Sequence, residues 1–240
     1  MTDNVLVIAS IYPDLLGTYG DGGNVITLRH RAGLRGIVTE VITVQPGDAV
    51  PNHADLYVMG GGEDTAQVAA CEALTRDGAL RRAADRGTPI LAICAGYQLL
   101  GSVFPDASGS PAPGLDLIDI STTRLPKRAV GELAADPMPG PGLLQRDRFT
   151  GYENHAGGTV LGEGVAPLAR VLSGVGNGDG TEGAVKDHII GTYLHGPCLV
   201  RNPDIADQLL EWATGTTLEA LVEPEVAELR AERFATVLGG

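Results

Sequence analysis

The chain has 240 residues, and its 30 acidic and 17 basic side chains give a formal net charge of −13 at pH 7. This charge argues against binding to nucleic acid or directly to anionic lipid. No apolar run approaches the ~20 residues of a membrane span, and no signal-peptide pattern precedes the first apolar segment. We therefore expect a cytoplasmic protein with one full hydrophobic core.

The first part of the chain alternates strand and helix patterns. Predicted strands cover residues 4–11, 39–44, 54–60 and 89–93, and predicted helices cover residues 23–36 and 66–86. This alternation predicts the α/β class, with a mostly parallel central sheet flanked by helices. We expect a single domain over residues 1–240, with a catalytic core of about residues 4–200.

A long loop, Tyr12–Asn24, joins the first predicted strand to the first predicted helix. Loops that contain Tyr, Asp and Gly are often simple turns. The residues of this loop do not by themselves assign it a role.

The third predicted strand ends in the sequence Gly60-Gly61-Gly62-Glu63-Asp64. A run of glycines at a strand end lets bare backbone approach a substrate closely. The loop is therefore a candidate source of backbone N–H donors.

The fourth predicted strand ends at Cys94, and only the small residues Ala92, Ala95 and Gly96 surround this thiol. A strand that turns sharply into a helix presents its corner side chain in a strained, exposed position and needs small neighbours. The helix N-terminus would favour the thiolate near neutral pH. The alternative is a buried core cysteine, which is common. Cys71 and Cys198 fit packing roles, and the three cysteines predict reduced thiols and no metal site.

The second half of the chain contains shorter elements. Loops are predicted at Pro105–Gly114 and Ala135–Gly142, and short strands and hairpins at residues 115–133 and 149–195. The glycine-rich stretch Ser173–Gly183 has neither a dinucleotide fingerprint nor a calcium-loop pattern, so we expect a flexible turn between two strands. Two helices are predicted at the end, over Pro203–Trp212 and Pro224–Leu238.

A strand that ends at His195 supplies a candidate base. The carboxyl ends of parallel strands meet at one sheet edge, so Cys94, His195 and the glycine loop could converge there. A nucleophile, a base and oxyanion donors are the minimum set for acyl transfer. A lone histidine at a strand end is more often capped or solvated, but the other two segments favour the catalytic interpretation.

Three cations, Arg124, Lys127 and Arg128, gather in one segment of an otherwise acidic chain. A solvated basic edge is the ordinary interpretation of such a run. An arginine could instead anchor the carboxylate of an amino acid through its planar fork. The pattern does not separate Arg124 from Arg128.

These segments together resemble the triad-type (class I) glutamine amidotransferases, most closely their cobyric-acid-synthase-like branch, over about residues 5–200. The turn at Cys94 and the strand that ends at His195 are typical of the superfamily. Further stretches resemble a subfamily of glutaminase subunits that act in peptidoglycan synthesis, namely Ile11–Asn24, Gly60–Asp64, Lys127–Gly131 and Gly151–His155. The resemblance implies a flavodoxin-like fold with a nucleophile elbow.

The resemblance also implies residue roles. Cys94 would attack the side-chain amide of glutamine, His195 would move the proton, and Arg128 would bind the substrate. The N–H groups of Ala95 and of the glycine loop, at Gly61, would hold the oxyanion. Gln98 lies one helical turn after Cys94 and could orient the substrate, although an ordinary exposed helix position is an equal alternative.

The chain departs from the superfamily at Pro197, where most members carry a glutamate that orients the histidine. Three explanations stay open. A Cys-His dyad could suffice, another acid such as Glu153, Glu182 or Asp187 could replace it, or a partner subunit could supply one. We favour the partner, because a carboxylate supplied in trans would keep the glutaminase idle until assembly.

Amide synthesis from a carboxylate requires activation, yet no lysine of this chain has the glycine context of a phosphate-binding loop. We therefore expect no cofactor in this chain, with ATP and Mg on a partner. The resemblance implies a Mur-ligase-like synthetase that amidates the D-glutamate of lipid II and forms a heterodimer with this chain. It also suggests that the Tyr12–Asn24 loop contacts this synthetase or the ammonia route. The alternatives are another carboxylate acceptor, such as a corrinoid, another cysteine hydrolase activity, or a non-catalytic scaffold.

Overall fold

The computed structural model describes residues 5–139 and 147–239. Its first sheet has the strand order β11-β12-β4-β3-β1-β2, and every neighbouring pair is parallel except β11 with β12. The bounds of these strands are β1 Leu6–Ile11, β2 Thr39–Val44, β3 Leu56–Met59, β4 Ile90–Ile93, β11 Ala184–Lys186 and β12 Ile189–Thr192. The predicted parallel sheet is confirmed.

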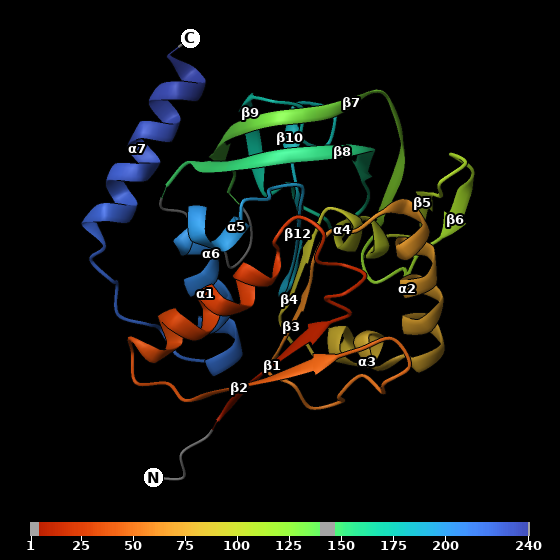
Figure 1. Ribbon diagram of the computed structural model, residues 1–240, viewed down its shortest axis with the longest axis horizontal. Helices are drawn as coiled ribbons and strands as arrows, with labels where there is room; N and C mark the ends of the chain where they lie inside the picture. The colour runs from red at the N-terminus through yellow and green to blue at the C-terminus, as the bar shows by residue number, and fades with distance from the viewer. Residues whose placement is uncertain (1–4, 140–146, 240) are drawn as a thin grey trace.

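Helices cover both faces of this sheet (Figure 1). On one side lie α1 (Gly22–Gly33), α5 (Cys198–Arg201) and α6 (Pro203–Thr214), and on the other lie α2 (Asp64–Asp77) and α3 (Ala79–Asp85). All residues of β3, β4 and β12 are buried, which fits their apolar sequences and the cover on both faces. The central strands are therefore rigid supports for whatever follows their carboxyl ends.

The predicted helix over residues 66–86 is two helices, α2 and α3. Gly78 separates them with φ 69°, in the left-handed region, and its N–H donates to the Leu74 carbonyl. Glycine adopts this conformation without a Cβ clash and so ends α2.

A second, mostly antiparallel sheet has the order β10-β9-β7-β5-β6, with β8 paired to β7. Its strands are β5 Val103–Pro105, β6 Pro111–Pro113, β7 Ile120–Pro137, β8 Phe149–Leu161, β9 Ala169–Ser173 and β10 Thr181–Glu182. The loop predicted at 105–114 is wrong in part, because its ends pair as the β5–β6 hairpin. The loop predicted at 135–142 begins later than expected, after β7, and residues 140–142 lie outside the described residues.

The second sheet lies across the carboxyl ends of the first sheet (Figure 1). Its long β7–β8 hairpin faces the tips of β1, β3, β4 and β12. The reactive segments predicted at those tips are therefore covered by the hairpin rather than open to solvent.

The two predicted C-terminal helices are present as α6 and α7 (Pro224–Leu238). Asp207 of α6 binds Arg31 and Arg35 at 2.7 and 2.8 Å, which joins α6 to the C-terminal end of α1. The helix α7 has no buried residue and packs along β7, β8 and β9 (Figure 1). Across residues 5–139 and 147–239, no helix is long and apolar enough to cross a membrane.

Candidate active site

Cys94 stands at the corner between β4 and the short helix α4 (Ala95–Leu99). Its φ of 50° and ψ of −103° are strained for a residue with a Cβ. Gly96 is needed beside it, because an added Cβ would come within 3.0 Å of the Gly60 carbonyl oxygen. The predicted sharp turn is confirmed, but the expected exposure of its corner side chain is wrong, because the two sheets bury the thiol.

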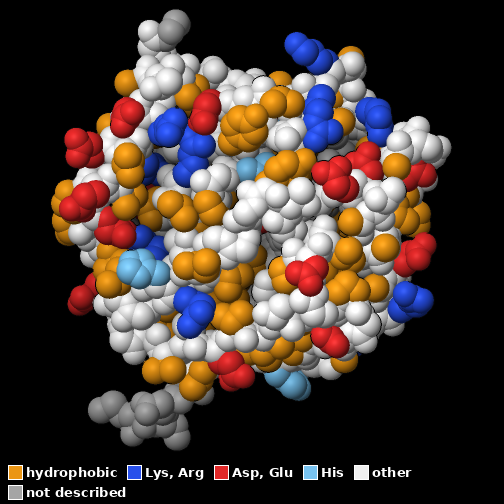
Figure 2. All heavy atoms as spheres, in the orientation of Figure 1, with side chains coloured by type: hydrophobic (Ala, Val, Ile, Leu, Met, Phe, Trp, Pro, Cys, Tyr) orange, Lys and Arg blue, Asp and Glu red, His pale blue; other side chains and the backbone are white. Residues whose placement is uncertain are grey.

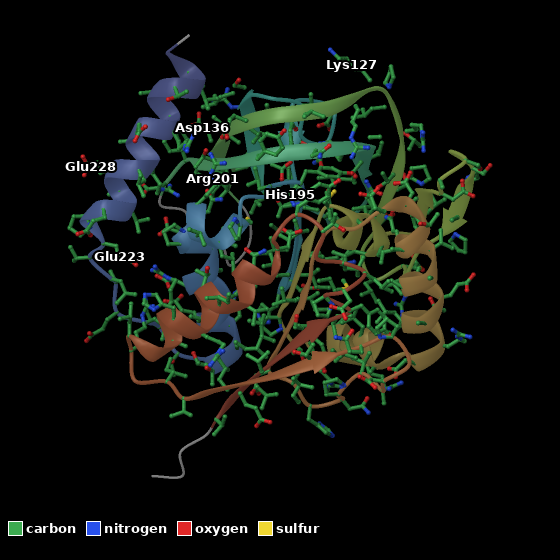
Figure 3. The ribbon with its side chains drawn as sticks, viewed as in Figure 1. Lys127, Asp136, His195, Arg201, Glu223 and Glu228 are labelled. Atoms are coloured by element: carbon green, nitrogen blue, oxygen red, sulfur yellow. The ribbon has the colours of Figure 1, made fainter. Side chains whose placement is uncertain are left out.

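His195 follows β12, the strand next to β4. The Cys94 N–H donates to the Thr192 carbonyl at 2.8 Å, which joins the two strand ends. The main chain of His195 also exchanges two hydrogen bonds, of 2.8 and 3.1 Å, with Tyr152 of β8. Both sheets therefore hold the main chain of His195 in place beneath β8 (Figure 3).

Asp21, at the start of α1, completes the set. Its carboxylate oxygens lie 3.1 and 3.2 Å from His195 Nδ1, and the residue is buried. A carboxylate accepts, so the proton resides on Nδ1 and Nε2 is left as the base. Nε2 is buried and has no hydrogen-bond partner among the described residues.

Gly61 is the point where these three side chains meet. An added Cβ there would lie 2.8 Å from His195 Cε1 and 3.2 Å from both Cys94 Cβ and an Asp21 carboxylate oxygen. The Gly61 N–H donates to Asp21 at 2.7 Å. Its predicted role as an oxyanion donor is therefore wrong for this structure, because the N–H already has an acceptor. Gly62 and Ala95, by contrast, both line the adjoining cleft.

The cleft beside the thiol is small, with a cavity of about 30 Å³. That space holds about two waters. The lining includes Tyr19, Glu63, Asp64, Gln98, Arg128 and His155.

Arg128 lies at this cleft, and Arg124 does not line it. The Arg128 Nε donates to Asn154 Oδ1 at 2.7 Å, and Nη2 donates to the Tyr19 hydroxyl at 3.4 Å. Arg124 instead pairs with Asp64 at 3.4 Å. Lys127 points away from the molecule into solvent (Figure 3). The structure thus places Arg128 at the cleft and Arg124 and Lys127 elsewhere, a distinction that the sequence pattern did not make.

Gln98 also lines the cleft and is buried, so it is not the ordinary exposed helix residue. Its amide oxygen accepts from Gln67 Nε2 at 2.9 Å, and its nitrogen donates to the Tyr193 hydroxyl at 3.4 Å. The protein itself therefore already uses both ends of this amide.

A cysteine at a strained corner, a carboxylate-bound imidazole and an arginine at one cleft agree with the comparisons with known proteins. Residues 7–203 match the CobB/CobQ-like glutamine amidotransferase domain. The chain belongs to this family.

Two similar members of the family are lipid II isoglutaminyl synthase (glutamine-hydrolyzing) subunits GatD. The one from Staphylococcus aureus is 34% identical over 95% of this chain and 93% of its own length. The one from Streptococcus pneumoniae is 33% identical over 87% and 80%. A cobyric acid synthase from Pelotomaculum thermopropionicum is 39% identical over 56% of this chain, but this match spans only 27% of that protein.

Solved structures support the fold of the family. A glutamine amidotransferase crystal structure has a TM-score of 0.61 and 20% identity over 87% of this chain and 99% of its own. Another, from Thermotoga maritima, has a TM-score of 0.55 and 18% identity over 98% and 93%. The predicted class I amidotransferase fold is confirmed.

The protonation of Cys94 differs from the sequence-based expectation. Burial, followed by the nearby charge of Asp21, raises the pKa of the Cys94 thiol to about 12. The expectation of a thiolate near neutral pH is therefore wrong for the substrate-free state. A helix of only five residues is too short a dipole to offset this desolvation.

The source of the third carboxylate also differs from expectation. Of the acids considered, Glu153 binds His155 and Glu182 binds Thr192, while Asp21 of this same chain binds His195. The hypothesis of an acid from a partner is thus not needed. The Tyr12–Asn24 loop supplies Asp21 to the site, and the centroid of its Tyr19 ring lies 4.8 Å from that of the His195 ring. Its contact with a partner or with the ammonia route stays a prediction.

A sequence signal for Asp21 exists. The residue follows the first parallel strand, whose tip shares the sheet edge with Cys94 and His195, and two glycines come directly after it. Gly23 packs against Pro197, with no room for a side chain.

Among the described residues, no group of three His, Cys, Asp or Glu could hold a metal ion.

Proposed function

We propose that this chain is the glutaminase subunit of a lipid II isoglutaminyl synthase and releases ammonia from glutamine at Cys94. The observation that carries the proposal is the meeting of Cys94, His195 and Asp21 around Gly61, beside a cleft that contains Arg128. The match to GatD over nearly the whole of both chains supports the choice of substrate.

In this proposal, glutamine enters as Arg128 exchanges partners. The substrate carboxylate replaces Asn154 Oδ1 at the guanidinium, because a charged acceptor binds a guanidinium more strongly than an amide oxygen does. Arg128 is exposed, so solvent can replace the partners that it releases. Glu63 and Asp64 line the same cleft and suit the substrate ammonium group.

His195 Nε2 takes the proton of the Cys94 thiol, and the resulting thiolate attacks the carboxamide carbon. The N–H groups of Ala95 and Gly62 hold the oxyanion. The imidazolium then protonates the nitrogen, the C–N bond breaks, and ammonia leaves a thioester on Cys94. Asp21 stabilises the imidazolium through Nδ1.

Water completes the cycle. His195 removes one proton from water, the hydroxide attacks the thioester carbon, and glutamate departs as Cys94 regains its proton from the imidazolium. The net reaction converts glutamine and water to glutamate and ammonia. No group outside this chain takes part in these steps.

The ammonia is used by a second polypeptide. We assign to it the MurT-type role: a Mur-ligase-like synthetase that binds ATP and Mg and amidates the D-glutamate of lipid II in a heterodimer with this chain. The word "subunit" in the relatives' names and the missing phosphate-binding loop support a separate synthetase. Because the match spans only a small part of a cobyric acid synthase, a corrinoid acceptor is the second candidate.

Isotope tracing tests the proposal. Glutamine labelled with ¹⁵N in its side-chain amide is incubated with the chain, the synthetase, ATP and lipid II, and the product is analysed by mass spectrometry. We expect the label in the D-isoglutamine amide with the parent chain and with Cys71→Ser, and none with Cys94→Ser. Added ammonium chloride should restore amidation by Cys94→Ser. Labelled product from Cys94→Ser would contradict the mechanism, and amidation of a corrinoid in place of lipid II would contradict the acceptor.

A further inference from the structure

Three consecutive residues of strand β8 lie beside the thiol. Glu153 and His155 are buried, and Asn154 and His155 both line the cleft. No step of the reaction proposed above uses Glu153 or His155, although burying two ionisable groups is costly unless they are paired.

The Glu153 carboxylate is held by the glycine-rich stretch that follows β9. Its Oε1 accepts the Val175 N–H at 2.8 Å, and its Oε2 accepts the Gly176 N–H at 2.9 Å. The stretch predicted as a flexible turn is therefore a cradle for this side chain. Both carboxylate oxygens act as acceptors here.

His155 has an acceptor at each ring nitrogen. Nδ1 lies 2.7 Å from the Gly157 carbonyl oxygen, and Nε2 lies 3.3 Å from Glu153 Oε2. Against a carboxylate, a neutral imidazole would point one bare lone pair at an oxygen, whichever tautomer it adopts. The backbone N–H donors on both Glu153 oxygens suit an ionised carboxylate rather than a carboxyl group that donates, and the imidazolium, with a proton on each nitrogen, then satisfies both contacts.

We propose that His155 is a buried imidazolium, and that the Glu153–His155 ion pair positions the strand segment Tyr152–His155 at the active site. The ring stacks on Tyr193, with centroids 3.7 Å apart and planes inclined by 11°. Both members of the pair are positioning residues, since neither contacts a reacting atom. The catalytic part of this proposal rests on the glutaminase function.

The segment matters because three reactive groups are placed against it. The Asn154 carbonyl oxygen lies 4.0 Å from Cys94 Sγ, and its side chain holds Arg128 at 2.7 Å. The Tyr152 main chain pairs with that of His195. A small shift of the segment would therefore move the surroundings of the nucleophile, the base and the substrate anchor together.

Other titratable groups pack around the imidazolium. Besides Glu153 on its own strand, they are Glu182 of β10 and Tyr193 after β12. Burial raises the pKa of Glu182 to about 7, and its Oε2 has no hydrogen-bond partner among the described residues. The Glu153 carboxylate, with two N–H donors and the imidazole, is therefore the counter-ion of His155.

The protonation state can be measured directly in the full chain. ¹⁵N NMR of the five histidine rings, with the His155 signals assigned from His155→Gln, reports which nitrogens carry protons. His188 is the matched control, since its Nδ1 lies 2.7 Å from the Gly87 carbonyl oxygen and its ring stacks on Trp212. At neutral pH we expect two ring protons on His155 and one on His188. A neutral His155 would overturn the proposal.

Glu153→Gln tests the positioning role, because it keeps the side-chain shape and removes the charge. We expect His155 to lose its second ring proton. A misplacement of the Tyr152–His155 segment by about 1 Å should lower kcat/KM for glutamine about 100-fold. The loosened segment should also let iodoacetamide modify Cys94 severalfold faster. His188→Gln should change none of these. Unchanged glutaminase kinetics and an unchanged alkylation rate in folded Glu153→Gln would overturn the role. NMR and alkylation need no glutamine, so they decide this proposal even if the parent chain proves inactive as a glutaminase.

Discussion

Asp21 has two opposed effects on the residues that it contacts. It accepts the Nδ1–H of His195, which leaves Nε2 as the base. Its negative charge also adds to burial in raising the pKa of Cys94 to about 12. The site thus gains an oriented base and accepts a thiol that is protonated at rest. Proton transfer must accompany substrate binding or attack.

Replacing Asp21 by Asn separates these effects. The amide NH₂ would face Nδ1 and favour the tautomer with its proton on Nε2, so kcat should fall by roughly 10²–10⁴. Loss of the charge lowers the thiol pKa, so iodoacetamide should modify Cys94 faster than in the parent. Asp14→Asn, an exposed acid of the same loop, is the control. Slower alkylation together with full turnover would contradict this role.

The pH dependence of alkylation tests the buried thiol itself. Because the folded pKa lies above that of a free cysteine, folding favours the protonated thiol. In the folded chain the alkylation rate of Cys94 should rise about tenfold per pH unit and should keep rising above pH ~8.5, where a free cysteine levels off. The urea-unfolded chain should level off there. A plateau near neutral pH in the folded chain would show that the thiolate is stabilised.

Gly61→Ala tests the close approach of the three side chains. The added Cβ would meet His195 Cε1 at 2.8 Å, so the imidazole or the loop must shift. We expect kcat to fall about 100-fold with the fold retained by circular dichroism. Gly33→Ala, where an added Cβ meets nothing within 4 Å, should leave kcat unchanged. Equal kcat values for the two variants would argue against the crowded geometry.

At the scale of elements, α1 connects the active site to the C-terminal helices. Asp21 precedes its first residue, and Arg31 near its end is buried against Asp207. Although burial alone would raise it, hydrogen bonds from Arg31 and Arg35 hold the pKa of Asp207 below its usual value. This stabilisation is therefore present above the unfolded pKa near 4 and is lost as the pH falls through the folded value.

Asp207→Ala should leave Arg31 buried without its main partner. Such a loss typically costs about 3–5 kcal/mol, which lowers the Tm of a chain of this size by roughly 6–20 °C. Asp136→Ala, at an exposed pair with Arg148 and Arg170, should cost at most ~1 kcal/mol. Calorimetry at neutral and acidic pH is the measurement. Equal Tm values for the two variants, or a difference that grows in acid, would contradict the buried pair.

The same elements show how far sequence reasoning reaches. Apolar strands that end at Cys94 and His195 predict the nucleophile and the base, because parallel strand tips share an edge. Asp21 escaped this reasoning because a loop of Tyr, Asp and Gly resembles an ordinary turn. Its place after the first parallel strand was the available signal, and its contacts with Gly61 and His195 show its role. The roles of Glu153 and His155 depend on contacts with the distant Val175–Gly176 backbone, which no local pattern encodes.

At the scale of the whole molecule, the site lies between two sheets with different contributions. The first sheet and its loops supply Cys94, His195 and Asp21, and the β7–β8 hairpin of the second supplies Arg128 and Asn154. Lys and Arg side chains lie along the upper edge of the face in Figure 2, over this hairpin, although the chain as a whole is acidic. Chemistry and substrate anchoring are thus divided between two layers.

The most direct measurement of this arrangement is labelling of the full chain with a glutamine-mimicking diazo-ketone, followed by peptide mass spectrometry. The account predicts one adduct, on Cys94, with labelling strongly slowed by His195→Gln and prevented by excess glutamine. An adduct on Cys71 or Cys198 instead, or equally fast labelling of His195→Gln, would contradict the claim that one thiol and one imidazole form the glutaminase site.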